Sequence, residues 1–192
     1  TSVGPPSGVE ADEIDGSGLA LAPGFIDVHT HDDIVVMTDP DHGCKTLQGV
    51  TSVVVGNCGM SAAPVSDDPL GFSRYRSLAD YLRRVEAARP AVNVGALVGH
   101  GTVRAAVMGL KTDRAPDDRE RQAMIRYVAV ALEDGALGMS SGLAYEPGRF
   151  AAHDELVDLA EVVAAAGGVY TTHMRDEGLD LIGSIEESIA VS

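Results

Sequence analysis

The chain has 192 residues, of which 45% are hydrophobic, and a formal net charge of −15 at pH 7. This length suits one domain with a substantial core, or part of a larger domain. The acidic charge disfavours nucleic acids and anionic membrane surfaces as partners, because Lys and Arg are the residues that bind phosphate groups.

The chain opens with a Gly- and Pro-rich segment, residues 1–22. We expect two short extended pieces around a turn there, as at the edge of a small β domain. The main domain is expected to cover residues 23–192. It begins with the mostly apolar run 25–28, which follows a Pro-Gly pair and predicts a buried strand.

Four further strands are predicted along the chain. Residues 51–56 are β-branched and apolar on both faces, which is typical of a fully buried strand. The other three predicted strands cover residues 93–99, 136–139 and 168–172.

Apolar residues recur at helical spacing between the predicted strands. One helix is expected before Pro90, and another begins at Pro116, a favoured first helical position, and ends near Gly135. Two more are expected around residues 156–163 and 181–189. Alternating strands and helices predict a parallel sheet, either doubly wound or closed into a barrel. Since we count five strands and a (β/α)8 barrel has eight, we favour a sequence that covers only part of a barrel.

Two histidines, His29 and His31, follow the first predicted strand. Side chains two residues apart on a strand point to the same face, so at its C-terminal end both can bind one ion. Imidazole suits zinc, iron, copper or nickel. On its own the His-x-His pattern is a weak signal, because two polar residues can simply finish a strand.

Cys58 and His173 stand at the ends of two other predicted strands. The C-terminal strand ends of a parallel barrel converge on one site, so both residues are expected close to His29 and His31. A cysteine is more often a buried, inert hydrophobe than a ligand. Metal-binding side chains at three strand ends are a rarer coincidence than one alone, and they favour a metal site.

Longer segments carry a resemblance to a known family: residues 24–33, 49–64, 99–104, 135–148 and 172–177. They resemble the N-acyl-D-amino-acid deacylases (D-aminoacylases) of the amidohydrolase superfamily. The resemblance runs from about residue 15 to the C-terminus, and Asn-Cys-Gly at 57–59 and Thr-His-Met-Arg at 172–175 are its most specific parts. It implies an α/β fold, a (β/α)8 TIM-type amidohydrolase barrel. This chain would supply about the first five β/α units, with residues 1–22 as part of a small β-sandwich domain.

The resemblance also implies zinc. It places Cys58 and His173 in a tight metal site, and His29 and His31 at a second, weaker metal position. Many amidohydrolases bridge two metals with a carboxylated lysine at the end of the fourth strand. The fourth predicted strand has no lysine near it. The deacylase subgroup that this chain resembles has a cysteine ligand in the bridging role instead, so the missing lysine supports the resemblance.

The implied activity is hydrolysis of the amide bond of an N-acyl-D-amino acid, a small-molecule substrate. Zinc would lower the pKa of a bound water to about 7, the hydroxide would attack the acyl carbonyl, and a carboxylate would pass the proton to the leaving amine. In the family that carboxylate is an aspartate at the end of the eighth strand, and a histidine after the sixth strand is a third ligand. Both are expected beyond residue 192, so the isolated chain is expected to lack activity.

Four residues near the strand ends are candidates for substrate contact. His100 and Arg104 follow the third predicted strand, with a loop-structuring role as the alternative. Tyr145 resembles a family position that lines the substrate pocket. Arg175 either holds a substrate carboxylate or pairs with one of the two acidic residues that follow it.

The remaining polar residues near these positions receive no catalytic role. Acidic residues beside the predicted ligands are interpreted as groups that orient those ligands or face solvent: Asp32, Asp33, Asp176 and Glu177. Two further histidines, His42 and His153, are predicted on the surface.

Two cysteines, Cys44 and Cys58, do not make a disulfide framework. No apolar run approaches the length of a membrane span, and the first residues lack a charged-then-apolar signal pattern. These features predict a cytoplasmic protein.

Two other interpretations stay open. A cyclic-amide hydrolase such as a hydantoinase or dihydroorotase belongs to the same superfamily, but the missing lysine counts against it. A non-catalytic zinc-binding fragment is the third interpretation, because five of eight barrel strands leave two open sheet edges. Self-association through these open edges is then expected.

Overall fold

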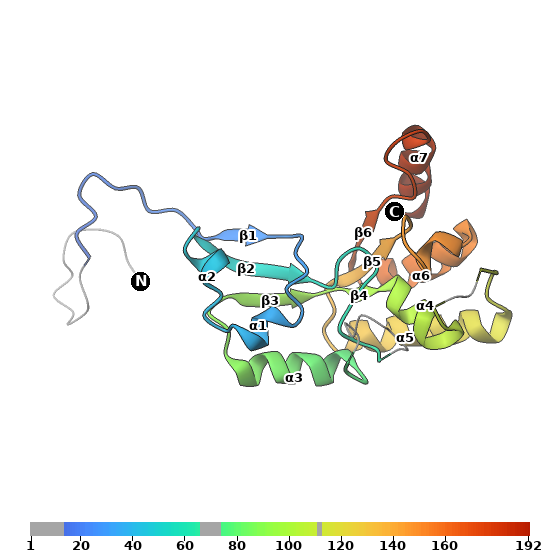
Figure 1. The fold of residues 1–192 in the computed structure, drawn as a ribbon, viewed down its shortest axis with the longest axis horizontal. Helices are drawn as coiled ribbons and strands as arrows, with labels where there is room; N and C mark the ends of the chain where they lie inside the picture. Colours follow the sequence, from blue (N-terminus) through green and yellow to red (C-terminus); the bar gives the residue numbers. More distant parts are fainter. Residues whose placement is uncertain (1–13, 66–73, 111–112) are drawn as a thin grey trace.

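The computed structural model describes residues 14–65, 74–110 and 113–192 (Figure 1). The strands are β1 (Phe25–Asp27), β2 (Val50–Val55), β3 (Asn93–Ala96), β4 (Val98–Gly99), β5 (Gly138–Gly142) and β6 (Val169–His173). The helices are α1 (Val35–Thr38), α2 (Gly43–Thr46), α3 (Leu78–Ala88), α4 (His100–Met108), α5 (Asp118–Glu133), α6 (His153–Ala165) and α7 (Leu181–Val191), with a 3-10 turn, η1 (Gly148–Phe150).

The described strands form two parallel three-stranded sheets, in the orders β1-β2-β3 and β4-β5-β6. Only Leu97 separates β3 from β4, so the strand predicted over residues 93–99 is split in two. The Leu97 N–H donates to Val55 O at 2.9 Å, and Ala96 O accepts from Leu137 N at 2.8 Å. One extended segment therefore pairs first with β2 and then with β5, a stagger of the kind that closes sheets into barrels.

Helices α3 and α5 lie along one side of the two sheets and the core lies between these layers, whereas α7 stands on the other side, above β6 (Figure 1). Val53 of β2, Tyr81 of α3, Val128 of α5 and Leu159 of α6 are almost completely buried in this core. Their positions follow from the apolar repeats that predicted these elements. Parallel strands with a helix between each pair are thus confirmed for the described chain.

Helix α4 was not among the predicted helices. Its buried side includes three polar side chains, His100, Thr102 and Arg104, as well as Val103. Polar residues on the inner face hide the apolar periodicity on which the helix predictions depend.

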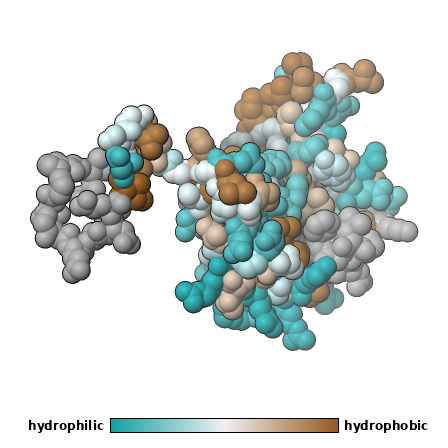
Figure 2. Space-filling model, turned by 60° about the vertical axis from the view of Figure 1, so that its left-hand side comes forward, coloured by the Kyte–Doolittle hydropathy of each residue, from teal (hydrophilic) through white to brown (hydrophobic). Residues whose placement is uncertain are grey.

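Strand β1 was expected to be buried, and this is wrong. Phe25 and Ile26 are 67% and 64% exposed, because β1 is the edge of its sheet and pairs only with β2. Helix α7 is similarly open: Ile182 and Ile189 are 67% and 70% exposed. Figure 2 shows the apolar surface over α7 at the top of the molecule.

The described part of the N-terminal segment, from residue 14, contains one turn and no strand before β1. In this turn the Leu19 N–H donates to Gly16 O at 2.9 Å. The segment extends away from the sheets (Figure 1), and residues 1–13 of the predicted small β domain lie outside the described residues. None of the helices in the described ranges is long and apolar enough to cross a membrane.

Candidate metal centre

The ends of three strands bring the predicted ligands together. His29 and His31 follow β1, Cys58 follows β2, and His173 is the last residue of β6. The ligand atoms of the first three lie within 4.8 Å of one another. Cys58 Sγ is 3.2 Å from His29 Nε2 and 3.8 Å from His173 Nδ1, so the thiol stands between the two histidine-bearing strands.

These separations fit a metal ion. Zinc binds nitrogen at about 2.0 Å and thiolate sulfur at about 2.3 Å, so two such donors on one tetrahedral ion lie about 3.5 Å apart. The two distances from Cys58 Sγ, 3.2 and 3.8 Å, lie on either side of that value. Soft thiolate and imidazole donors together suit zinc better than magnesium or calcium.

A tight backbone turn places Cys58 in this position. Gly56, Cys58 and Gly59 have φ angles of 78°, 54° and 74°, all in the left-handed region. A Cβ at Gly56 would lie 2.1 Å from Leu97 O, so no other residue fits there without displacing β-sheet backbone. For Cys58 the positive φ is an uncommon conformation, of the kind that gathers at functional sites.

The electrostatics favour a neutral histidine and a protonated thiol when no cation is present. Burial raises the pKa of the Cys58 thiol, and the Glu177 carboxylate adds to this effect. Partial burial and the neighbouring His29 hold the pKa of His31 below its usual value. Neutral imidazole is the form that binds metals, and a bound cation is the group that would turn the Cys58 thiol into a thiolate.

On the β1 side, two carboxylates flank the histidine pair. Asp27 Oδ2 accepts a hydrogen bond from Lys45 Nζ at 2.5 Å, and this bond lowers the pKa of Asp27. Asp32 Oδ2 accepts from Thr30 Oγ1 at 2.6 Å and lies 3.1 Å from His42 Nε2. The surface position predicted for His42 is wrong: its side chain is fully buried, because it fills the space between Asp32 and helix α2.

Asp33, the other acidic residue after the histidine pair, lies inside the fold. Burial raises the pKa of its carboxyl to about 6, although the backbone amides of Gly56 and Ala62 donate to it. The carboxyl group therefore holds the loop that carries Cys58.

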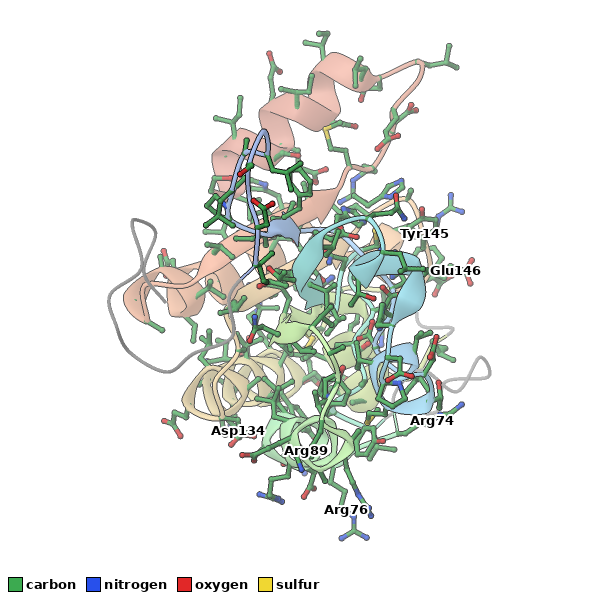
Figure 3. All side chains as sticks on the ribbon, turned by 90° about the vertical axis from the view of Figure 1, so that its left-hand side faces the viewer. Arg74, Arg76, Arg89, Asp134, Tyr145 and Glu146 are labelled. Atoms are coloured by element: carbon green, nitrogen blue, oxygen red, sulfur yellow. The ribbon has the colours of Figure 1, made fainter. Side chains whose placement is uncertain are left out.

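On the β6 side, His173 is held by fewer contacts. Tyr145 OH lies 3.1 Å from His173 Nδ1, and Glu177 Oε1 lies 3.6 Å from Nε2. Tyr145 is 44% exposed, and Figure 3 shows it beside Glu146, well above the helices that carry Arg89 and Asp134. Of the four residues predicted to contact substrate, Tyr145 is the one that this structure brings to the ligands and leaves accessible.

His100 and Arg104 lie in the protein interior rather than at the metal centre. Both side chains are fully buried and both bind Glu155 of α6, the His100 Nε2 to Oε1 distance being 2.8 Å. Burial raises the pKa of Glu155, but the bond from His100 and the charge of Arg104 outweigh it and hold that pKa below its usual value. This arrangement favours a structural role for His100 and Arg104 over contact with a substrate.

Arg175 pairs with Glu187 of α7, not with either acidic residue that follows it. Its Nε and Nη2 lie 3.0 and 2.8 Å from the two Glu187 oxygens, and Nη1 donates to Arg149 O at 2.6 Å. The predicted local pair is therefore wrong, because α7 folds back over the end of β6. His153 is exposed at the start of α6, as predicted.

Two residues had no predicted role. Lys45 pairs with the carboxylates beside the histidine pair, and Glu155 pairs with His100 and Arg104 in the interior. One signal for Lys45 was present: only two of the fourteen basic residues are lysines, so each stands out. Glu155 had no such signal, because an acidic residue in the first turn of a helix is ordinary.

The chain is similar to several known proteins. A family model described as "Amidohydrolase family" matches residues 12–188. The N-acyl-D-glutamate deacylase of Alcaligenes xylosoxydans xylosoxydans is 43% identical over 99% of this chain and 41% of its own length.

Two solved structures are also similar. The first is the N-acyl-D-glutamate deacylase of Bordetella bronchiseptica, complexed with zinc and a phosphonate inhibitor that mimics the tetrahedral intermediate. It is 42% identical with a TM-score of 0.81, and the match covers 88% of this chain and 37% of that chain. The second is a D-aminoacylase with a binuclear metal centre, described by one-metal activation and second-metal attenuation. It is 42% identical with a TM-score of 0.83, and the match covers 88% of this chain and 38% of that chain. The chain thus spans about two fifths of the length of the relatives that it matches.

Proposed function

The chain belongs to the amidohydrolase family, and on that premise we propose that the full-length protein is a zinc-dependent hydrolase of N-acyl-D-amino acids. Its products would be a D-amino acid and a carboxylate. The observation that carries the proposal is the position of Cys58 Sγ, which lies 3.2 Å from His29 Nε2 on one side and 3.8 Å from His173 Nδ1 on the other. Deacylase relatives that are more than 40% identical over most of the chain support the substrate class.

Four side chains would hold the metal. We assign Cys58 and His173 to the tight zinc, and His29 and His31 to a second, weaker position. Cys58 Sγ lies within 4 Å of a ring nitrogen on each side, a place that suits a thiolate shared by the two positions. Bound zinc would supply a Lewis acid that polarises the acyl carbonyl and lowers the pKa of a water molecule.

The chain's own residues would mainly bind and orient. Tyr145 is exposed beside His173 and can donate its hydroxyl proton to a substrate oxygen. Arg175 is engaged by Glu187, so a substrate carboxylate would have to compete with a two-point ion pair. The aspartate that moves the proton to the leaving amine is expected beyond residue 192.

The proposed fold of the whole protein is a (β/α)8 barrel. We propose that this chain supplies five of its β/α units, with β3 and β4 counted as one staggered strand. Residues 1–22 are proposed to belong to a small β-sandwich domain. The exposed apolar residues of β1 and α7 support a barrel that continues past both sheet edges, and an isolated chain of residues 1–192 would be inactive and self-associate.

The cytoplasmic location also remains a proposal. It is supported by the absence of a disulfide between Cys44 and Cys58, which lie free in the structure.

The test is an assay of the full-length protein with N-acetyl derivatives of an acidic, an aliphatic and an aromatic D-amino acid, beside their L enantiomers. We expect amine release from at least one D substrate, loss of activity after chelation, and recovery with zinc. A metal-replete, folded protein that releases no amine from any of them would contradict the proposed substrate class. Cleavage of cyclic amides instead would favour a hydantoinase-type activity.

A further inference from the structure

We propose that Lys45 is a positioning residue, which fixes His29 and His31 in the orientation that a metal ion requires. The inference rests on the metal-binding role proposed above. It concerns a side chain outside the set of ligands, on the short helix α2 that follows the histidine pair.

The backbone that carries the pair is held at both ends by a carboxylate. Before the pair, Asp27 accepts a hydrogen bond from His29 N at 3.2 Å and one from Lys45 Nζ at 2.5 Å. After the pair, Asp32 Oδ2 lies 2.6 Å from Thr30 Oγ1 and 3.5 Å from the same Lys45 Nζ. One ammonium group therefore joins the two anchors of the loop.

The chemistry of lysine suits this position. Its ammonium group is a compact charge with three donors, so it can bind oxygens of two different residues at once. Without it, the negative charges of Asp27 and Asp32 would repel each other, and both carboxylates could turn toward a cation held by the neighbouring histidines. Lys45 thus fixes the loop and also keeps two oxygen ligands away from the nitrogen donors.

The helix that carries Lys45 is itself fixed. A helix of four residues is not stable alone, so it needs tertiary support. His42, fully buried at its N-cap with φ 48°, supplies that support: its carbonyl accepts from Lys45 N at 2.9 Å, and its ring reaches Asp32 at 3.1 Å.

The effect is expected in metal affinity rather than in folding. The Lys45, Asp27 and Asp32 side chains are 21%, 26% and 18% exposed, and ion pairs with access to water contribute little to stability. Partners that orient metal ligands, by contrast, typically change metal affinity by about 10- to 100-fold.

The first test needs no metal. We would measure backbone hydrogen–deuterium exchange in the metal-free full-length protein and in its Lys45→Met, Lys45→Arg and Arg83→Met variants. Arg83 is the matched control, because it forms an exposed ion pair with Asp80 away from the histidine pair. We expect the His29 amide to exchange about tenfold faster in Lys45→Met, to be largely restored in Lys45→Arg, and to be unchanged in Arg83→Met. Unchanged exchange in Lys45→Met would overturn the inference.

The second test is zinc affinity, measured by competition with a chromogenic chelator. Lys45→Met is expected to weaken the binding that depends on the histidine pair by about 10- to 100-fold. In a His29→Ala/His31→Ala background the same substitution is expected to have no further effect. An equal loss in that background would show that Lys45 acts elsewhere and would overturn the inference. A wild-type protein that binds no zinc would instead contradict the proposed function, and the exchange result would still decide the role of Lys45.

Discussion

The β1 side and the β6 side of the metal centre are supported in different ways. On the β1 side, Lys45 and a buried histidine hold the two carboxylates that flank the histidine pair. On the β6 side, His173 contacts an exposed tyrosine and has an exposed glutamate 3.6 Å away. Both β1 and β6 are edges of their sheets, so the two sides differ in the number of contacts that hold the predicted ligands, not in the openness of the edge.

The two sides also differ in the side-chain networks that support their strands. Beside β1 lies the small, partly buried network of Lys45, Asp27 and Asp32, whereas the strands on the β6 side rest on a fully buried cluster of Glu155, His100 and Arg104. The order of the expected effects follows from this: the buried cluster should govern folding, and the contacts at the metal centre should govern metal binding.

Glu155→Gln should have the largest effect. It removes the buried negative charge that His100 and Arg104 both contact, and breaking a buried ion pair typically costs about 3–5 kcal/mol. Denaturant unfolding of the full-length protein would measure the loss. Glu161→Gln, at an exposed position of the same helix, should change the free energy of unfolding little. A similarly small loss in both variants would show that the β6 side does not depend on the buried cluster.

The exposed apolar residues of α7 should make the isolated chain of residues 1–192 associate with itself. Replacing Ile182 and Ile189 by Asp should weaken that association by about tenfold or more, because each exposed isoleucine covered in a contact contributes about 1.5–3 kcal/mol. Sedimentation velocity over a range of concentrations would detect it. Leu47→Asp, at a position that is 90% exposed on the β1 side, is the control. Equal association of all variants would place the contact elsewhere.

Tyr145→Phe sharpens the contrast between the two sides. It removes the hydroxyl that lies 3.2 Å from His173 Nε2, the ring nitrogen left free when Nδ1 binds zinc, so zinc affinity should fall by only about two- to fivefold. This is less than the loss expected for Lys45→Met on the β1 side. Chelator competition on the two variants in parallel would measure the difference, and a larger loss in Tyr145→Phe would reverse the proposed ranking.

The smallest effect is expected far from both sides, at the N-terminus of α5. The Arg114 side chain and the Asp117 amide donate to Glu120 and lower its pKa to about 2. Because the folded-state pKa is depressed, this contribution to stability is present above about pH 4.5 and is lost as the pH falls toward 2. Glu120→Gln should lower the melting temperature by about 1–3 °C at pH 7 and by nearly nothing near pH 2. A pH-independent difference would mean that the charge of Glu120 contributes nothing.

Much of the metal centre could be predicted because it follows from local rules. The two-residue spacing predicts that His29 and His31 share a face, and their ligand atoms do lie close together, although both residues lie beyond the end of β1. Parallel strands bring Cys58 and His173 close to each other. The exposure of β1 could not be predicted, since it depends on which strands are absent beside it. The pairing of Arg175 with Glu187 likewise depends on how α7 folds back.

The buried polar contacts were also beyond the sequence. His42 and Glu155 have the residue types of surface positions, and only the tertiary fold gives them partners that make burial favourable. The same holds for α4, whose inner face is polar and therefore lacks a clear apolar period.

The central claim is that Cys58 holds the tight zinc at the point where the two sides meet. The most direct measurement is the zinc content of the full-length protein, by elemental analysis, beside its Cys58→Ala and Cys44→Ala variants. Cys44 is the matched control, because it is the exposed free cysteine of the chain. We predict that tightly bound zinc is lost in Cys58→Ala and retained in Cys44→Ala. Full zinc content in a folded Cys58→Ala variant would contradict the account.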